Sequence, residues 1–219
     1  LSSHYEIRVF DTKRKSRKGF RFVGIQEAAR NDVVLLCVPS SQMEPVLKRL
    51  RNHVRPGTLV MDACSLKVRP CILMEKLLPR NVEIIGTHPL FGPQSARQGI
   101  RGKTIILARV RASDAMVKET RRLLHKLGLK VREMTPEQHD RQAARSQALH
   151  TFVFKALEAS GMRESELPLA SRAKLLEAMD LVREDSEQLF RDMQKLNPFA
   201  AKERKKFIKL LQKIDRDLK

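Results

Sequence analysis

Short apolar runs typical of buried β-strands alternate with helical patterns through the first 135 residues, and this alternation constrains the fold more than any other feature. Strands are expected near residues 5–10, 20–23, 33–38, 58–61, 82–85, 104–108 and 129–132. Helices are expected over 25–30, 43–50, 68–78 and 113–127, with Ser40 or Ser41 capping the second and Ser113 the last. The continuous run 33–38 is typical of a parallel strand buried on both faces. The pattern predicts an α/β domain with a parallel sheet and helices on both faces.

The pattern changes at Pro136. Helical segments follow over residues 137–160, 170–182, 186–196 and 199–218, with no strand pattern between them. We therefore expect two domains, an α/β domain at 1–135 and an all-helical domain at 136–219. The helices carry more apolar positions than one helical layer can bury, so we expect some of them to pack against a second copy of the chain.

Composition narrows the possible partners and location. The formal net charge is +19, but the Lys and Arg residues are spread along the chain and aromatics make up only 5% of it, so nucleic-acid binding is not expected and an anionic small molecule is the better ligand. No apolar run approaches the roughly 20 residues that span a bilayer, and the start of the chain does not resemble a signal peptide. The three cysteines, Cys37, Cys64 and Cys71, lack metal-ligand spacing. Buried structural thiols, a cytoplasmic location and no metal site are expected.

The segment Gly86-Thr87-His88-Pro89-Leu90-Phe91-Gly92-Pro93 places one histidine where an apolar strand ends. Ligands of open α/β sheets bind outside the carboxyl ends of the strands, and the loops there carry function. His88 is therefore a candidate for chemistry. The alternative is a loop histidine that only hydrogen-bonds a carbonyl.

Asp11 follows the first predicted strand. An acidic residue at this place in a doubly wound sheet binds the ribose 2′-hydroxyl of a dinucleotide, although acidic residues also end strands as turn formers. The motif G-x-G-x-x-G, expected roughly 20 residues earlier, is not in the sequence. Residues 1–4 look like the end of a helix. We therefore expect the first β-α unit, with its phosphate loop, to be missing from this chain.

Five segments in order resemble the prephenate and arogenate dehydrogenases of tyrosine biosynthesis. They are Asp11, the strand DVVLLCVPS, the loop DACSLK, the segment GTHPLFGP, and a helical part that contains EQHDR, QALH and NPFA. The resemblance covers nearly the whole chain and implies a Rossmann-like domain followed by a helical domain that forms dimers.

The implied reaction is an oxidative decarboxylation with hydride transfer to NAD(P). A group must take the ring hydroxyl's proton as hydride departs, and a neutral histidine suits this role. By resemblance His88 is that residue, and Ser65 hydrogen-bonds the same hydroxyl. Ser65 has an alternative role as the N-cap of the helix that starts at Val68.

The implied substrate carries two carboxylates, so cationic or hydrogen-bonding groups are needed. By resemblance His150 is a substrate-binding histidine, and Arg172 lies about where the family has a carboxylate-binding arginine. A solvated surface position is the alternative for Arg172. Lys67 would anchor the substrate or only neutralise its loop.

The cofactor-binding residues expected are Asp11 and Thr12 after the first strand, and Val38 and Pro39 after the strand at 33–38. Asp11 favours NAD, because a carboxylate repels a 2′-phosphate. The basic residues at 13–15 would offset that repulsion, so NADP stays open. Prephenate and arogenate are not distinguished.

Two other functions are also compatible with the sequence. One is a non-catalytic or regulatory dimeric module that has lost the cofactor phosphate loop. The other is a different β-hydroxyacid-type dehydrogenase, which would place a catalytic lysine on the long helix after the sheet. Lys155 lies there, but its Gly-rich and Lys-x-x-Asn surroundings are absent.

Overall fold

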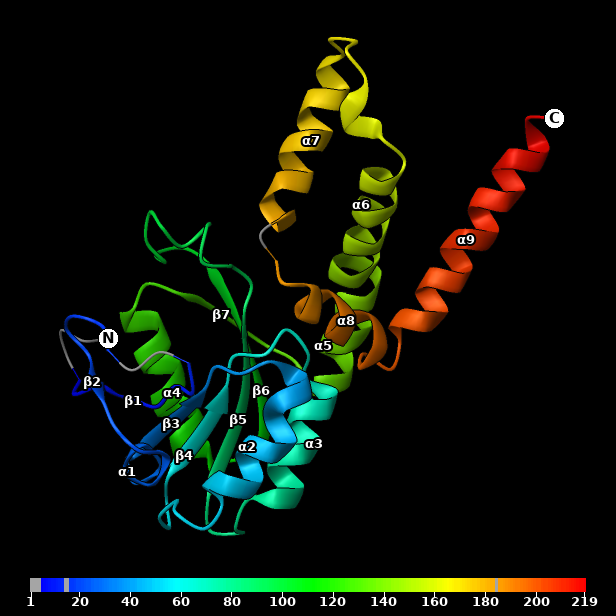
Figure 1. Ribbon diagram of the computed structural model, residues 1–219. Coiled ribbons are helices and arrows are strands. Elements are labelled where there is room, and N and C mark those ends of the chain that lie inside the picture. The colour runs from blue at the N-terminus through cyan, green and yellow to red at the C-terminus, as the bar shows by residue number, and fades with distance from the viewer. Residues whose placement is uncertain (1–4, 14–15, 184) are drawn as a thin grey trace. The chain divides into compact units, whose positions relative to one another are not determined.

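The structure is a computed structural model that describes residues 5–13, 16–183 and 185–219. The chain divides into two compact units, Leu1–Pro136 and Glu137–Lys219. The helix end expected at residues 1–4 lies outside the described residues. Figure 1 shows a strand-rich first unit and a helical second unit.

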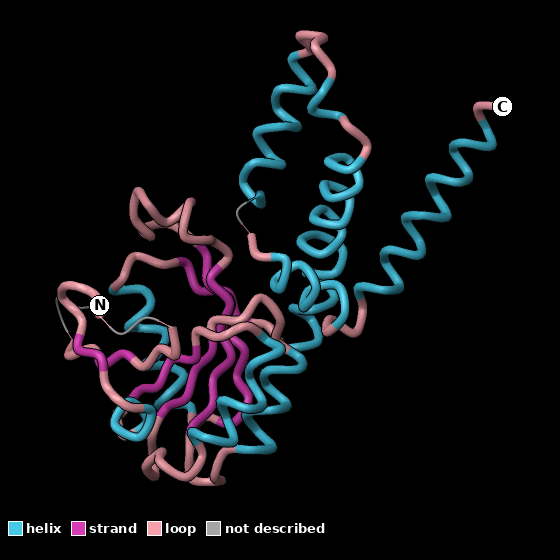
Figure 2. The backbone as a smooth tube through the Cα atoms, in the orientation of Figure 1, coloured by secondary structure: helices cyan, strands magenta, loops and turns pink. Residues whose placement is uncertain are grey.

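A five-stranded sheet forms the centre of the first unit. Its strand order is β3-β4-β5-β6-β7. The bounds are β3 Val33–Leu36, β4 Leu59–Asp62, β5 Glu83–Pro89, β6 Thr104–Arg111 and β7 Lys130–Glu133. A separate parallel pair consists of β1 (Arg8–Val9) and β2 (Arg21–Phe22). The α/β prediction is confirmed (Figure 2).

The expectation of an entirely parallel sheet is wrong at one position. Strands β3, β4 and β5 are parallel to one another, and so are β6 and β7, but β5 and β6 are antiparallel. The connection over residues 90–103 consists of loops and turns. Parallel neighbours need a crossover, usually through a helix, whereas antiparallel neighbours do not.

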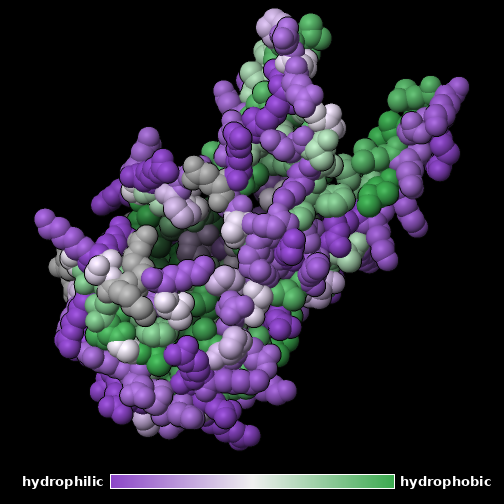
Figure 3. Space-filling model, viewed as in Figure 1, coloured by the Kyte–Doolittle hydropathy of each residue, from purple (hydrophilic) through white to green (hydrophobic). Residues whose placement is uncertain are grey.

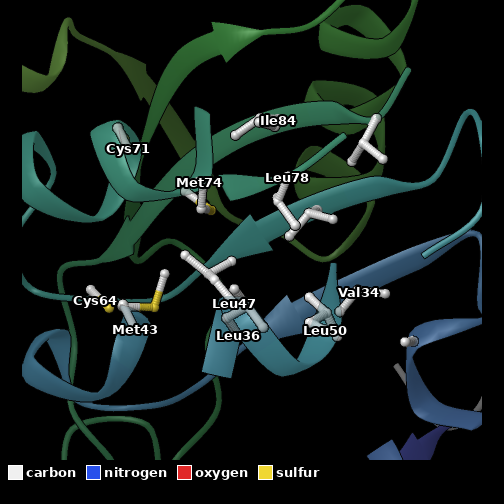
Figure 4. Close-up of a cluster of buried hydrophobic side chains, with 13 residues drawn as sticks. Val34, Leu36, Met43, Leu47, Leu50, Cys64, Cys71, Met74, Leu78 and Ile84 are labelled. Carbon is white, nitrogen blue, oxygen red and sulfur yellow. The ribbon is translucent and has the colours of Figure 1, made fainter. Parts of the chain in front are cut away.

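Helices cover both faces of the sheet. On one face α1 (Ile25–Ala29), α2 (Met43–Leu50) and α3 (Val68–Leu77) pack on β3, β4 and β5, and on the other α4 (Asp114–Lys126) packs on β4, β5 and β6 (Figure 1). Successive strand residues alternate between the faces: Val60 and Ile84 belong to the first core, Met61 and Ile85 to the second. Figure 4 shows the first core. Burial of each large aliphatic side chain stabilises the fold by about 1.5–3 kcal/mol.

Two local expectations differ from the structure. Val33 and Leu35 are 49% and 48% exposed, so β3 is buried on one face only. It is the edge strand, and the core under α4 is built from β4, β5 and β6. Neither Ser40 nor Ser41 caps α2, because a short 3₁₀ turn, Ser40–Gln42, precedes that helix and buries Ser40. The cap at Ser113 is confirmed, since its side chain accepts from the Met116 amide.

The second unit is helical throughout its regular elements. Its helices are α5 Pro136–Ala143, α6 Leu149–Ala159, α7 Ala170–Arg183, α8 Glu187–Lys195 and α9 Ala200–Asp217. A π-helical turn, Ala144–Ala148, joins α5 to α6, and a 3₁₀ turn, Met162–Glu164, follows α6. The long helix expected over 137–160 is therefore continuous but widened at one turn. Within the described ranges, no helix is both long and apolar enough to cross a bilayer.

Candidate active site

The carboxyl ends of three parallel strands meet at one edge of the sheet. The register aligns Leu36, Asp62 and Gly86 across β3, β4 and β5. The segments that follow these residues contain Val38 and Pro39, the loop 63–67, and residues 87–89. These segments contain several of the site residues predicted from the sequence. Ligands of open α/β sheets bind outside the carboxyl ends of the strands, which is where these segments lie.

His88 lies within β5 and not in a loop. The strand continues through Gly86 to Pro89 because β6 pairs with it along this length, with His88 opposite Ile106 and Pro89 opposite Ile105. The His88 side chain is 4% exposed. The imidazole is therefore held by a sheet at its carboxyl edge, which restricts its position more than a loop would.

A buried ion pair connects the end of β4 to the residue before His88. Asp62 and Lys67 are both fully buried and form a salt bridge. One carboxylate oxygen of Asp62 accepts from the Thr87 amide at 3.1 Å, and the other from the Cys64 amide at 3.0 Å. Lys67 Nζ also donates to the Thr87 carbonyl at 2.6 Å, and the Thr87 hydroxyl donates to the Asp62 carbonyl.

This network changes the roles expected for its loop. Lys67 was a candidate substrate anchor, but its ammonium is 0% exposed and is hydrogen-bonded to Asp62 and Thr87. The N-cap residue of α3 is Lys67, so Ser65 is not the cap of that helix. Ser65 is half-buried in the loop between the two members of the ion pair.

Asp62 and Thr87 were missed by the sequence reasoning. A signal for Asp62 was available, because an aspartate that ends an apolar strand with a lysine five residues later is a candidate for a buried pair. For Thr87 the sequence holds no such signal, since its three hydrogen bonds depend on the register between β4 and β5.

The cysteines are free, and two of the three are buried. Burial, reinforced by the charge of Asp62, raises the pKa of the Cys64 thiol to about 12. That thiol donates to the Val38 carbonyl at 3.4 Å, which ties the loop after β4 to the segment after β3. The expectation of a buried thiol is wrong for Cys37, which is exposed because it follows the edge strand β3.

The predicted cofactor residues lie at the ends of β1 and β3. Asp11 and Thr12 are exposed after β1, and an Asp11 carboxylate oxygen accepts from the Lys13 amide at 2.7 Å. Val38 is partly buried and Pro39 is exposed. The strand before Asp11 pairs with β2 and not with the main sheet, contrary to the expectation. An exposed carboxylate can accept a hydrogen bond from a ribose hydroxyl, so Asp11 fits the adenosine side of a dinucleotide. Among the residues that the structure describes, no cluster of three His, Cys, Asp or Glu side chains could hold a metal.

In the second unit His150 lies on α6, one residue after its start. Its ring is half-buried and lies 5.4 Å from that of Phe154, centroid to centroid. Burial lowers the pKa of His150, against smaller opposing effects from the Ser146 carbonyl and the charge of Asp185. The neutral imidazole is thus favoured.

Two motifs of the second unit meet in a buried cluster. His139 and Asp140 are 4% and 0% exposed, and His139 Nδ1 lies 2.8 Å from an Asp140 carboxylate oxygen. Asn197 donates to the Asp140 carbonyl at 2.9 Å and accepts from the Phe199 amide at 2.9 Å. The segments EQHDR and NPFA therefore hold the start of α5 against the start of α9.

Arg172 lies on α7 and is partly buried. Its guanidinium donates to the main-chain carbonyls of Met162 at 3.3 Å and Arg163 at 3.0 Å. Those contacts close the turn between α6 and α7. They favour a structural role over the substrate contact that the sequence suggested.

An open pocket of about 450 Å³ lies at the opposite, amino-terminal end of β5, lined among others by Arg80, Glu83 and Arg111. Arg111 donates there to main-chain carbonyls of residues 75–82. Because ligands of such sheets bind at the carboxyl ends, the candidate site remains at His88.

Several known proteins are similar to this chain. Residues 5–133 match the family described as prephenate dehydrogenase, nucleotide-binding domain. The chain is 31% identical to arogenate dehydrogenase 2, chloroplastic, of Arabidopsis thaliana, over 85% of this chain and 54% of that protein. It is 28% identical to a probable arogenate/prephenate dehydrogenase of Methanocaldococcus jannaschii, over 89% of this chain and 45% of that protein. The chain thus spans about half the length of the curated relatives it matches.

A solved structure has the same fold. It is prephenate dehydrogenase from A. aeolicus in complex with hydroxyphenyl propionate and NAD+, with a TM-score of 0.73 and 20% identity. The alignment covers 90% of this chain and 73% of that one.

Proposed function

Because this chain belongs to the prephenate dehydrogenase family, we propose that it carries out the NAD(P)-dependent oxidative decarboxylation of prephenate or arogenate. One observation supports the proposal most: a buried histidine, His88, stands at the carboxyl edge of the sheet in the matched nucleotide-binding region. Its backbone is fixed from both sides, by β6 and by the contacts of Thr87.

The proposed chemistry assigns His88 as the proton acceptor. Its neutral imidazole takes the proton of the ring hydroxyl as the carbonyl forms, since a carbonyl oxygen is much less basic than an alkoxide. The Ser65 hydroxyl hydrogen-bonds the same oxygen. The bound NAD(P)+ would supply the acceptor for the hydride of the carbon that bears this hydroxyl. The bond between the ring and its carboxylate breaks and carbon dioxide leaves. The electron pair of that bond stays with the ring and completes its aromatic system.

Cofactor and substrate contacts are proposed for fewer residues than the sequence suggested. Asp11 and Thr12 would hold the adenosine ribose, and Val38 and Pro39 would line the cofactor path after β3. His150 stays the substrate-binding residue of the helical unit. The two cations Lys67 and Arg172 already bind groups of the protein, and we assign them structural roles.

We also propose that the chain forms a homodimer through the helical unit. Helix α9 exposes a row of apolar side chains: Ile208 40%, Leu211 50%, Ile214 55% and Leu218 82% exposed. Figure 3 shows apolar surface beside hydrophilic surface along this helix. The spacing of three or four residues places them on one face, and such a face is normally covered by a partner.

Light scattering after gel filtration tests the dimer. Ile214→Glu should shift the protein to the monomer mass, whereas Lys213→Glu, a charge change at the neighbouring position, should leave it dimeric. A parent protein that runs as a monomer at micromolar concentration would contradict the proposal. The cytoplasmic location expected from the cysteines stays a prediction.

Turnover of the intact protein tests the activity. Prephenate and arogenate are each supplied with NAD+ and with NADP+, and the absorbance of the reduced nicotinamide is followed. His88→Asn should lower kcat by about 100- to 10,000-fold, the usual contribution of a general base. His53→Asn, a histidine outside the site, should behave like the parent. No turnover with any combination, or equal rates for His88→Asn and the parent, would refute the dehydrogenase.

The alternative dehydrogenase with a lysine on the long helix has no support in the geometry. Lys155 forms an ion pair with Glu187 on α8, and its Nζ lies 4.9 Å from the centroid of the Phe190 ring. About half of its side chain is exposed. These contacts account for Lys155 as a residue that holds α6 to α8.

A further inference from the structure

Thr87 is the residue immediately before His88. All of its polar groups are hydrogen-bonded to the buried pair of Asp62 and Lys67, either to the two side chains or to the main-chain carbonyl of Asp62. Its amide donates to the Asp62 carboxylate at 3.1 Å, and its carbonyl accepts from Lys67 Nζ at 2.6 Å. Its hydroxyl donates to the Asp62 carbonyl. The carbonyl in question belongs to the peptide bond that joins Thr87 to His88. The position of the histidine main chain therefore follows the position of the pair.

The same ion pair encloses Ser65. Asp62 Oδ2 accepts from the amide of Cys64, the residue before Ser65, at 3.0 Å. Lys67 lies two residues after Ser65 and begins α3 as its N-cap residue. Both ends of the loop that carries Ser65 are thus fixed by the groups that fix Thr87.

Stability alone does not account for this arrangement. Removing two charges from water costs several kcal/mol per ion, and well-packed apolar residues of similar volume are often equally stable. What an ion pair adds is direction: two oxygens and an ammonium hold three main-chain groups at set distances. Apolar side chains would fill the space without fixing those groups.

We propose that Asp62, Lys67 and Thr87 are positioning residues that set the mutual placement of His88 and Ser65. They do not contact the substrate. Asp62 and Lys67 are 0% exposed and Thr87 is 1% exposed. The effects that we expect on kcat and KM rest on the proposed dehydrogenase function.

Thr87→Val is the mildest test, because valine keeps the shape of threonine and removes only the hydroxyl. The main-chain contacts of Thr87 with the pair remain. We expect kcat to fall by about 10- to 100-fold, as for a misplacement of up to 1 Å, with little change in the KM of either substrate. Thr87→Ser, which keeps the hydroxyl, should recover most of the loss.

The matched control is Thr120→Val on α4. Thr120 is 3% exposed, and its hydroxyl has no hydrogen-bond partner among the described residues. The same substitution there should leave kcat at the parent value and should not lower the melting temperature. A kcat loss in Thr120→Val equal to that of Thr87→Val would overturn the positioning role.

A double variant separates positioning from folding. Asp62→Leu with Lys67→Met replaces the ion pair by apolar groups of similar size, so no unpaired buried charge remains. We expect a cooperative thermal transition at a lower temperature than that of the parent, because the amides of Cys64 and Thr87 and the Thr87 carbonyl lose their side-chain partners. The kcat should be at least as low as that of Thr87→Val. A folded double variant with the parent kcat would overturn the inference.

A spectroscopic readout does not depend on turnover. In protein labelled with ¹⁵N-histidine, the His88 ring signals are those lost in His88→Asn. Thr87→Val should shift or broaden them while the His150 signals stay in place. Unchanged His88 signals would overturn the positioning role even if the parent is active. An inactive parent in which these signals still respond would refute the proposed function and keep the positioning role.

Discussion

Gly86→Ala is a test of how closely α3 packs on β5. Gly86 does not have a positive φ, so an alanine there meets no backbone strain. A Cβ would, however, lie 2.7 Å from Cys71 Sγ and 3.4 Å from Lys67 Cδ. Optimal contacts between such atoms are about 3.5–4.0 Å, so α3 or β5 must move by about 1 Å. Cys71 is 2% exposed and cannot give way into solvent.

The expected cost is that of an overpacked core, about 1–3 kcal/mol in the free energy of unfolding. For a chain of this size each kcal/mol lowers Tm by about 2–4 °C. Thermal and urea unfolding followed by circular dichroism measure both quantities. Because Thr87 follows Gly86, the shift should also lower kcat.

Two further variants identify the contact responsible. Cys71→Ala removes the sulfur that Cβ would meet, so combining it with Gly86→Ala should recover about 0.5–3 kcal/mol relative to the sum of the single effects. Gly92→Ala has no atom within 4 Å of the added Cβ and no positive φ, and should be neutral or slightly stabilising. Full stability of Gly86→Ala, or additive effects of Gly86→Ala and Cys71→Ala, would refute the reasoning.

Three other outcomes follow from burial and hydrogen bonding. Ellman's reagent should label only Cys37 in the folded protein and all three thiols after unfolding, because Cys64 and Cys71 are buried. Cys37→Ser should then show no labelling before unfolding. Burial lowers the pKa of His150, so the imidazole binds a proton more readily in the unfolded chain than in the folded one. The free energy of unfolding should therefore fall as the pH drops below about 6.5, and less steeply in His150→Gln when urea unfolding is repeated across this range. Arg111→Met removes the guanidinium donor of four main-chain carbonyls, of which that of Pro79 keeps the Val82 amide as a donor. The urea-unfolding free energy should fall by about 1–3 kcal/mol, and an unchanged midpoint would contradict this.

The parts of the fold that follow from local pattern were predicted from the sequence. The apolar runs that form β4 and β5 are buried, as the composition of each run predicts, and the side chain of Ser113 caps α4 from within the same segment. The direction of β6 is not local. Its pairing with β5 depends on the path of the chain over residues 90–103, where the sequence has turn residues but no periodic pattern.

The candidate site shows the same division. His88 was identified because a strand-end histidine is a local signal, yet its place inside β5 depends on pairing with β6. The sequence suggested Lys67 either as a substrate anchor or as a charge that only neutralises its loop. The spacing of Asp62 and Lys67 is a local signal for a buried pair, but the contacts of this pair with Thr87 depend on the pairing of β4 with β5.

Long-range hydrogen bonds also hold the segment before His150 in the second unit. Ala148 is the last residue of the π-helical turn. Its carbonyl accepts from the side-chain amide of Gln194 at 2.6 Å. The side-chain oxygen of Gln194 accepts from Arg204 on α9 at 2.7 Å. In each unit a buried side chain from another element therefore holds a main-chain carbonyl close to a candidate histidine. His88 directly follows the Thr87 carbonyl, and His150 lies two residues after the Ala148 carbonyl. A position that must be kept to a fraction of an ångström is better fixed by such directional contacts than by apolar packing, and buried polar groups are retained where they are fully satisfied in this way.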